Sequence, residues 1–284
     1  SIWVLQFNGT TATSKLIQKN QAALSPHGTQ ASFTISKTTN QQTFYLLANI
    51  DESHLPALNT RLDNFQAIKL KIDAYNPGNS LPMTATWTGA ATANDAPEKA
   101  EFERLVAKIE VNITGKFNGL DIKSVTMVSI PGGTLIKQPT VSSTTETEYN
   151  INPLSPARQN GDSYVFYIPE NMQGEVADIT DPYNKAFLKA PYVSSYIRIE
   201  GKYPTDAGEA KVIYEIYPGG NNTPNVDIKR NHLDKLQFDL QGTNDADQRV
   251  ADLGDVIDLN EEAYANSYIV SKSYQKYIFD ARIK

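Results

Sequence analysis

An alternation of apolar and polar residues with a period of two recurs along the chain and constrains its fold more than any other feature. In the clearest case, residues 105–113, every second position is apolar: Leu105, Ala107, Ile109, Val111 and Ile113. Such spacing puts one face of a strand on a core and the other in water, as in antiparallel sheets. Similar strands are predicted at residues 2–7, 43–48, 163–168, 193–199, 212–217 and 236–240.

Helical periodicity is confined to one stretch. Apolar residues there are spaced by three, four and three, which would align them on one stripe of a helix: Leu55, Leu58, Leu62 and Phe65. Asp51 could cap the start of that helix. A short helix across the end of a sheet and a loop with apolar anchors both fit the pattern.

Turn residues separate the predicted strands. Gly, Pro and Asn cluster at residues 76–79, 131–133 and 218–222, while residues 136–162 and 201–210 are polar and predicted to be rich in loops. Many short strands joined by turns predict an all-β fold of antiparallel β-sandwiches, with a short helix or two.

The chain has 284 residues, which is longer than one typical domain. A small and polar stretch, residues 92–103, precedes the strongest predicted strand and offers a boundary. We therefore expect an N-terminal sandwich domain at residues 1–103 and a larger C-terminal one at residues 104–284.

Composition excludes several classes of function. The absence of cysteine rules out a disulfide scaffold, thiol catalysis and a cysteine zinc site. A net charge of -6 argues against a nucleic-acid partner. The three histidines, His27, His54 and His232, lie too far apart in sequence for a local metal motif. We expect no metal and no cofactor.

No nucleophile elbow, phosphate-binding loop or zinc-protease motif occurs in the sequence. Carboxylates are plentiful, so a glycosidase pair stays open as a hypothesis. The acidic residues between Asp245 and Asp258 lack the spacing of a calcium loop and are interpreted as a solvated loop or an adventitious cation site. Trp87 lies among small polar residues and could stack on a sugar, whereas Trp3 is predicted to face a core.

Five segments together resemble one family, the fimbrillin-like type V pilins of Bacteroidetes. The first two are the opening strand Ile2–Gly9 and the later Phe44–Asn49. The others are the strand led by Arg104, the Tyr-x-Pro-Glu-Asn segment with Pro169, Glu170 and Asn171, and the Arg-Asn-His segment with Arg230 and Asn231. They occur in the family's order and span residues 2 to about 250.

The resemblance implies a structural protein and not an enzyme: two transthyretin-like sandwiches that assemble into a fimbria, or pilus, by donor-strand exchange between subunits. It also implies export as a lipoprotein to the outer membrane, with the lipid-bearing cysteine and the cleaved arginine upstream of Ser1. The expected partners are other pilin subunits and a host or bacterial surface ligand such as a glycan. The predicted exchange or edge segments are Ile2, Trp3, Val4, Leu5 and Phe7 near the start, and Tyr277, Ile278 and Phe279 near the end.

The C-terminal residues differ from those of major pilins, which end in an apolar donor strand. Ala265–Val270 resembles larger fimbrillin-like adhesins, in which more sequence follows. Either residues 264–284 contain the donor strands or the chain continues past Lys284, which would favour a tip or accessory subunit. Two other functions remain open: a cell-surface carbohydrate-binding protein that does not polymerise, and a glycan hydrolase.

Overall fold

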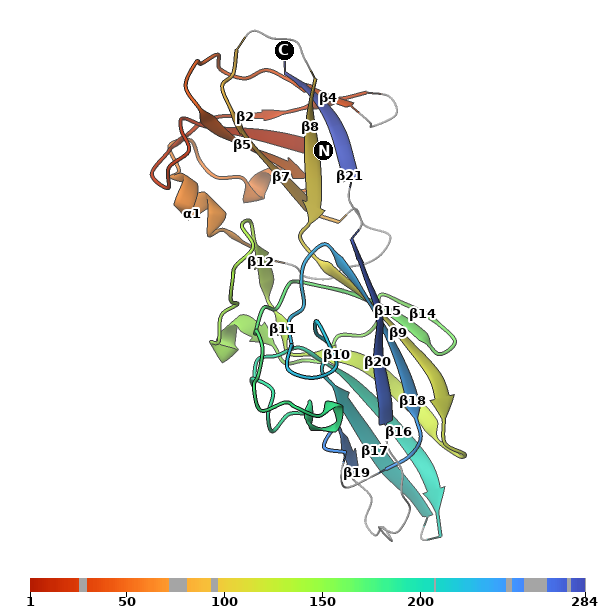
Figure 1. Ribbon diagram of the computed structural model, residues 1–284. Helices are drawn as coiled ribbons and strands as arrows, with labels where there is room; N and C mark the ends of the chain where they lie inside the picture. The colour runs from red at the N-terminus through yellow and green to blue at the C-terminus, as the bar shows by residue number, and fades with distance from the viewer. Residues whose placement is uncertain are drawn as a thin grey trace.

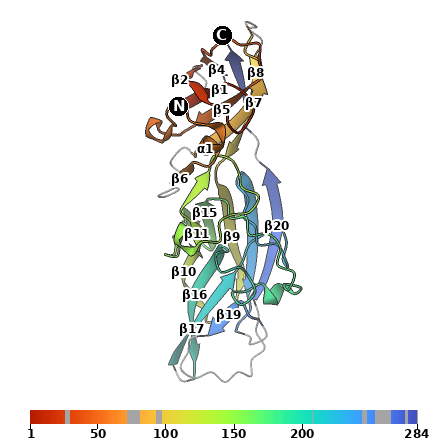
Figure 2. The same ribbon diagram turned by 90° about the vertical axis from the view of Figure 1, so that its left-hand side faces the viewer.

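The structure is a computed structural model, and it describes residues 1–25, 30–71, 81–92, 97–206, 208–243, 247–252, 265–274 and 277–283. Strands make up most of its regular structure, so the predicted all-β fold is confirmed. Figures 1 and 2 show an elongated molecule with two groups of sheets placed end to end. We call them the N-terminal lobe, which contains the first strand, and the C-terminal lobe.

The N-terminal lobe is an eight-stranded sheet in the order β2-β1-β5-β7-β8-β21-β4-β3. Its strands are β1 (Ile2–Phe7), β2 (Leu16–Gln21), β3 (Ala23–Leu24), β4 (Gln30–Phe33), β5 (Gln42–Ala48), β7 (Met83–Gly89), β8 (Pro97–Arg104) and β21 (Tyr277–Ile283). One apolar cluster joins β1 and β5 to β4 and β8, so the sheet closes on itself as a sandwich. On the other face of β1 and β5, the helix α1 (Leu62–Gln66) covers Phe7 and Tyr45 through Phe65.

The C-terminal lobe packs two sheets around one core. The first has four strands in the order β10-β16-β17-β19, and the second has five in the order β14-β15-β9-β18-β20. The strands are β9 (Ala107–Lys116), β10 (Asp121–Val128), β14 (Arg158–Asn160), β15 (Ser163–Ile168), β16 (Tyr196–Thr205), β17 (Gly208–Ile216), β18 (His232–Leu240), β19 (Val250–Asp252) and β20 (Ala265–Tyr274). The predicted alternation in β9 is confirmed, because Ala107, Ile109, Val111 and Ile113 are all buried.

Two small sheets lie between and beside these layers. Strand β6 (Lys69–Lys71) of the N-terminal lobe pairs with β12 (Gly133–Leu135) of the C-terminal lobe. Strand β11 (Ile130–Pro131) pairs with β13 (Tyr149–Asn150), next to the short 3-10 helix η2 (Glu146–Glu148). The β6–β12 pair therefore joins the two lobes through the backbone of two paired strands, and we call it the backbone connection between the lobes.

The strand predictions agree with the structure to different degrees. Residues 2–7 and 163–168 have the predicted limits as β1 and β15, and the other five predicted strands are present with shifted ends. Residues 201–210 were expected to form a loop but complete the β16–β17 hairpin, whose pairing reaches Thr205 and Gly208. Residues 97–103 belong to the polar stretch predicted to hold the domain boundary, but with Arg104 they form β8, in which buried Ala100 and Phe102 alternate with exposed Glu101 and Glu103.

The apolar stripe, which fitted either a short helix or a loop, is helical only at its last two residues, Leu62 and Phe65 of α1. Asp51 does cap a start, since its carboxylate accepts a hydrogen bond from the Ser53 backbone at 2.9 Å, but the element is the 3-10 helix η1 (Glu52–His54). Leu62 and Phe65 are buried in α1, whereas Leu58 is 53% exposed. Within the described residues, no helix is both long and apolar enough to cross a membrane.

The last described strand, β21, lies in the N-terminal lobe. The two strands beside it in the sheet are distant from it in the sequence. It runs antiparallel to β8 and parallel to β4. The chain therefore returns to its first lobe at the end. The division at residues 103 and 104 stays a prediction.

Candidate functional site

The residues of the Tyr-x-Pro-Glu-Asn and Arg-Asn-His segments come together at the end of the C-terminal lobe that meets the N-terminal lobe. Pro169 and Glu170 follow β15 directly, and Arg230 precedes β18 by two residues. Backbone hydrogen bonds of 2.8 Å in both directions between Asn171 and Ile228 hold the two segments side by side.

Glu170 and Arg230 form an ion pair inside the protein, with side chains that are 2% and 1% exposed. Thr134 donates its hydroxyl to the second carboxylate oxygen of Glu170 at 2.6 Å. Burial raises the pKa of Glu170, and the positive charge of Arg230 opposes that shift. A buried pair of this kind is stable only when further hydrogen bonds satisfy both groups.

Arg230 also donates hydrogen bonds to the segment that connects the lobes, through both of its terminal guanidinium nitrogens. Its guanidinium donates to the backbone oxygens of Leu135 at 2.7 Å and Ile136 at 3.1 Å. Leu135 is the last residue of β12, whose register pairs it with Lys69 of β6. The ion pair therefore positions the C-terminal half of the backbone connection between the lobes.

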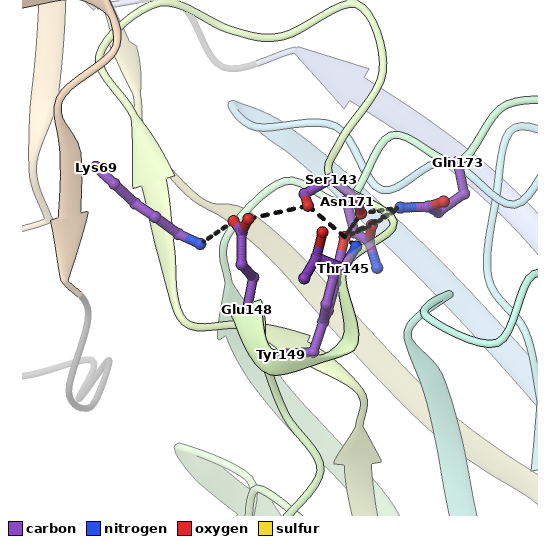
Figure 3. A network of polar contacts seen from close by, with 7 residues as sticks. All are labelled: Lys69, Ser143, Thr145, Glu148, Tyr149, Asn171 and Gln173. Carbon is purple, nitrogen blue, oxygen red and sulfur yellow. Dashed lines mark hydrogen bonds and ion pairs between the residues drawn. The ribbon is translucent and has the colours of Figure 1, made fainter.

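Asn171 lies at the centre of a second polar network (Figure 3). Its amide donates to the Val193 carbonyl at 2.8 Å and to the Ser195 hydroxyl at 3.0 Å. Its side-chain oxygen accepts from Gln173 at 2.9 Å and lies 3.2 Å from the Tyr149 hydroxyl oxygen. Asn171 is fully buried, so its whole hydrogen-bonding capacity is used to fix loops of the C-terminal lobe.

The network continues outward to the surface and to the other lobe (Figure 3). The Tyr149 hydroxyl donates to the Ser143 carbonyl at 2.6 Å, and the Ser143 hydroxyl donates to Glu148 at 3.0 Å. Glu148 completes the chain with an ion pair to Lys69 of β6 at 2.8 Å. Burial raises the pKa of Tyr149 to about 12, whereas hydrogen bonds from Lys69 and Ser143 lower the pKa of Glu148.

Arg104 and Asn231 lie where β8 leaves the N-terminal lobe. Asn231 adopts a φ of 58°, a left-handed conformation that asparagine tolerates better than most residues. Its side-chain oxygen accepts a hydrogen bond from the Arg104 backbone at 3.3 Å, and its own backbone N–H donates to Val106 at 2.8 Å. These contacts attach the chain between the lobes to the start of β18.

The two predicted exchange segments differ in their placement. Strand β1 is paired on both sides, with β2 and β5, and Ile2, Val4, Leu5 and Phe7 are buried while Trp3 is partly buried. It is an interior strand, so the expectation of an edge at residues 2–7 differs from the structure. The alternation predicted a strand but could not predict that both of its edges would be occupied.

Tyr277, Ile278 and Phe279 open β21, which lies between β8 and β4. The register places them opposite Phe102, Glu101 and Ala100 of β8. The other C-terminal strand, β20, pairs with β18 at the edge of the five-stranded sheet. The end of the chain thus supplies one strand to each lobe.

The residues considered for chemistry are placed apart. His54 is exposed on η1, His232 has a ring nitrogen 2.9 Å from the Arg230 carbonyl, and His27 lies outside the described residues. Among the described residues, no group of three or more His, Asp or Glu side chains could hold a metal. Asp247 forms a buried ion pair with Arg249 at 2.8 Å, and Trp87 stacks on Phe44 at 4.6 Å between ring centroids.

Comparisons with solved structures agree on the fold. The tip fimbrial protein Mfa3 from Porphyromonas gingivalis, with a C-terminal truncation, is 15% identical and has a TM-score of 0.55 over 94% of this chain and 93% of that one. A candidate cell adhesion protein from Parabacteroides distasonis is 13% identical, with a TM-score of 0.56 over 95% of this chain and 93% of that one. The chain has the fold of these fimbrial and adhesion proteins.

That fold confirms the structural side of the resemblance to fimbrillin-like proteins. A family profile described as a domain of unknown function, DUF4906, matches residues 166–237, which include Glu170, Asn171, Arg230 and Asn231. No curated protein sequence matches the chain significantly. Thr134 and Tyr149, which complete the polar networks, lie in stretches where the sequence shows no pattern that could have identified them. Ser195 lies in the predicted strand 193–199, but alternation does not predict its hydrogen bonds.

Proposed function

We propose that the protein is a structural or adhesive subunit of a bacterial cell-surface fimbria that binds other subunits by exchanging C-terminal strands. The observation that carries this proposal is the position of β21 inside the sheet of the N-terminal lobe, between β8 and β4. A strand from the far end of the chain completes a lobe built mainly from its first residues. The same place can receive the equivalent strand of another copy.

The physical reason lies in what β21 covers. Without it, β8 and β4 would each expose a row of unpaired backbone groups, which is an edge that invites pairing with another chain. Ala31, Phe33, Ala100 and Phe102 of these two strands are buried in one apolar cluster. A donor strand would satisfy the backbone groups and cover that cluster, as in other cases of strand addition.

The proposal includes the location and the partners. The subunit would sit in a fimbria at the outer membrane, with other pilin subunits as partners, and would be exported as a lipoprotein. The fold shared with a tip fimbrial protein supports a tip or accessory position over a stalk position. An adhesive role is supported by exposed apolar residues on one loop of the C-terminal lobe, Phe187, Leu188 and Tyr192.

Cysteine trapping on cells tests the exchange, because the chain has no cysteine of its own. Glu101 and Ile278 are opposite each other in the β8–β21 register, and directly opposite residues approach most closely across a strand pair. The variant E101C/I278C, produced in the bacterium that makes the protein, is expected to give a ladder of disulfide-linked multimers on a non-reducing gel. Monomers containing only an internal disulfide would overturn the proposal.

A second pair serves as the matched control. Lys202 and Lys211 are opposite each other within the β16–β17 hairpin, so K202C/K211C should remain monomeric whether or not strands are exchanged. A carbohydrate-binding surface protein that does not polymerise would show no ladder with either pair. A glycan array with the F187A/Y192A variant as the comparison tests the adhesive role separately.

A further inference from the structure

One carboxylate lies on the apolar face of the sheet that receives β20. Asp234 of β18 is 1% exposed and is followed at every second position by buried Leu236, Phe238 and Leu240. In the same row across the sheet, Ile109 of β9 and Phe166 of β15 are fully buried. A carboxylate in such a row is costly unless its charge is compensated.

The register of β20 supplies a residue of opposite charge at that position. Lys272 is the Cα partner of Asp234 in the antiparallel β18–β20 pair. In the next row, beyond a register shift between Lys235 and Leu236, Ile269 is opposite Leu236. Directly opposite residues share one face of a sheet, so at these two positions the register places a basic residue opposite Asp234 and an apolar residue opposite Leu236.

We propose that Asp234 sets the register of the strand that pairs with β18, by requiring a basic residue at the position that Lys272 occupies. Alternation alone excludes a slip by one residue, which turns every side chain over, but tolerates a slip by two. A slip by two moves Lys272 away from Asp234 and leaves the buried carboxylate without a cation opposite. The need for a basic residue opposite Asp234 would therefore specify which strand fits and in which alignment.

This inference rests on the proposed function only for the question of which chain supplies the strand. Within a fimbria, the acceptor would select donor strands that carry Lys or Arg three residues after the apolar residue opposite Leu236. Strands with apolar alternation but no cation at that position would be rejected. Asp234 thus acts as a specificity determinant for the partner strand.

The test measures register in the purified full-length protein. Gln237 and Tyr268 are opposite each other in the β18–β20 register, so Q237C/Y268C provides a reporter disulfide. Its effective thiol concentration is measured in a glutathione redox buffer. We expect K272D to lower it by about 30-fold, since it places a second carboxylate opposite the buried Asp234, and the swap D234K/K272D to restore most of the loss.

Two further variants keep the test decisive. K235Q removes the charge of a half-exposed lysine at the neighbouring position of β18, 3.9 Å from Glu110 of β9, and should leave the reporter disulfide unchanged. K272R should also leave it unchanged, and it serves if D234K does not fold. The proposal is overturned if K272D has no effect, or if a folded D234K/K272D is no better than the worse single variant.

The proposed strand exchange can fail independently of this inference. The reporter disulfide forms inside one purified chain, whereas exchange is measured as covalent multimers on cells with E101C/I278C. Coupling between Asp234 and Lys272 without multimers would support the register determinant and overturn the exchange. Multimers without coupling would do the reverse.

Discussion

The connection between the lobes contains two ion pairs that differ in burial. Glu170 and Arg230 are almost fully buried and hold β12 from inside the C-terminal lobe. Lys69 and Glu148 join the lobes directly, but their side chains are 35% and 44% exposed. We infer that the junction is stabilised mainly by the buried pair, which positions β12 from inside the C-terminal lobe. The exposed pair that crosses the junction contributes only slightly.

The largest effect is expected from breaking the buried pair. E170Q leaves the Arg230 guanidinium charged and without its carboxylate, and arginine cannot lose its proton in a protein. We expect a loss of about 3–5 kcal/mol in the free energy of unfolding. Urea denaturation measures this loss.

A double replacement sharpens the interpretation of that loss. E170M/R230M removes both charges and retains side chains of similar length, so it should recover much of the stability lost in E170Q. If E170Q lowers the free energy of unfolding by less than K69M, which breaks the exposed pair between Lys69 and Glu148, the contrast between the two pairs is wrong.

The second effect concerns the buried amide of Asn171. N171A leaves the Val193 carbonyl without its side-chain donor and removes a donor from Ser195, inside the lobe. We expect a loss of about 2–3 kcal/mol, because buried polar groups left without partners are costly. The matched control is N160A on exposed β14, which should stay within about 0.5 kcal/mol of the original protein.

The third effect is a pH dependence at Tyr149. Its pKa is raised to about 12 by burial, so between about pH 10 and 12 the folded chain keeps a proton that the unfolded chain releases. Stability from this group is complete below pH 10 and is lost as the pH rises to about 12. Thermal melts should therefore fall less steeply over that range in Y149F than in the original protein. Parallel slopes would contradict the assignment.

The sequence predicted individual strands better than it predicted which strands pair with each other. Alternation in β9 follows from one face being buried, so the strand could be recognised locally although its ends are shifted. The resemblance identified Glu170 and Arg230, which are 60 residues apart in sequence. Neither the alternation nor the resemblance could predict that Arg230 contacts carbonyls near residue 135. They also could not predict that β21 inserts into the first lobe, because strand pairing depends on the whole fold and not on a local pattern.

The smallest effect is expected at the exposed pair. K69M removes the ammonium and retains most of the side chain, so it should cost no more than about 0.5 kcal/mol, and the difference should shrink in about 1 M salt. Because hydrogen bonds lower the pKa of Glu148, its contribution is present near neutral pH and is lost as the pH falls through that pKa, so K69M and the original protein should converge in acid. Urea titrations at two salt concentrations and two pH values measure this. A loss as large as that in E170Q would show that the charge pair across the lobes, and not the buried support of β12, holds the junction.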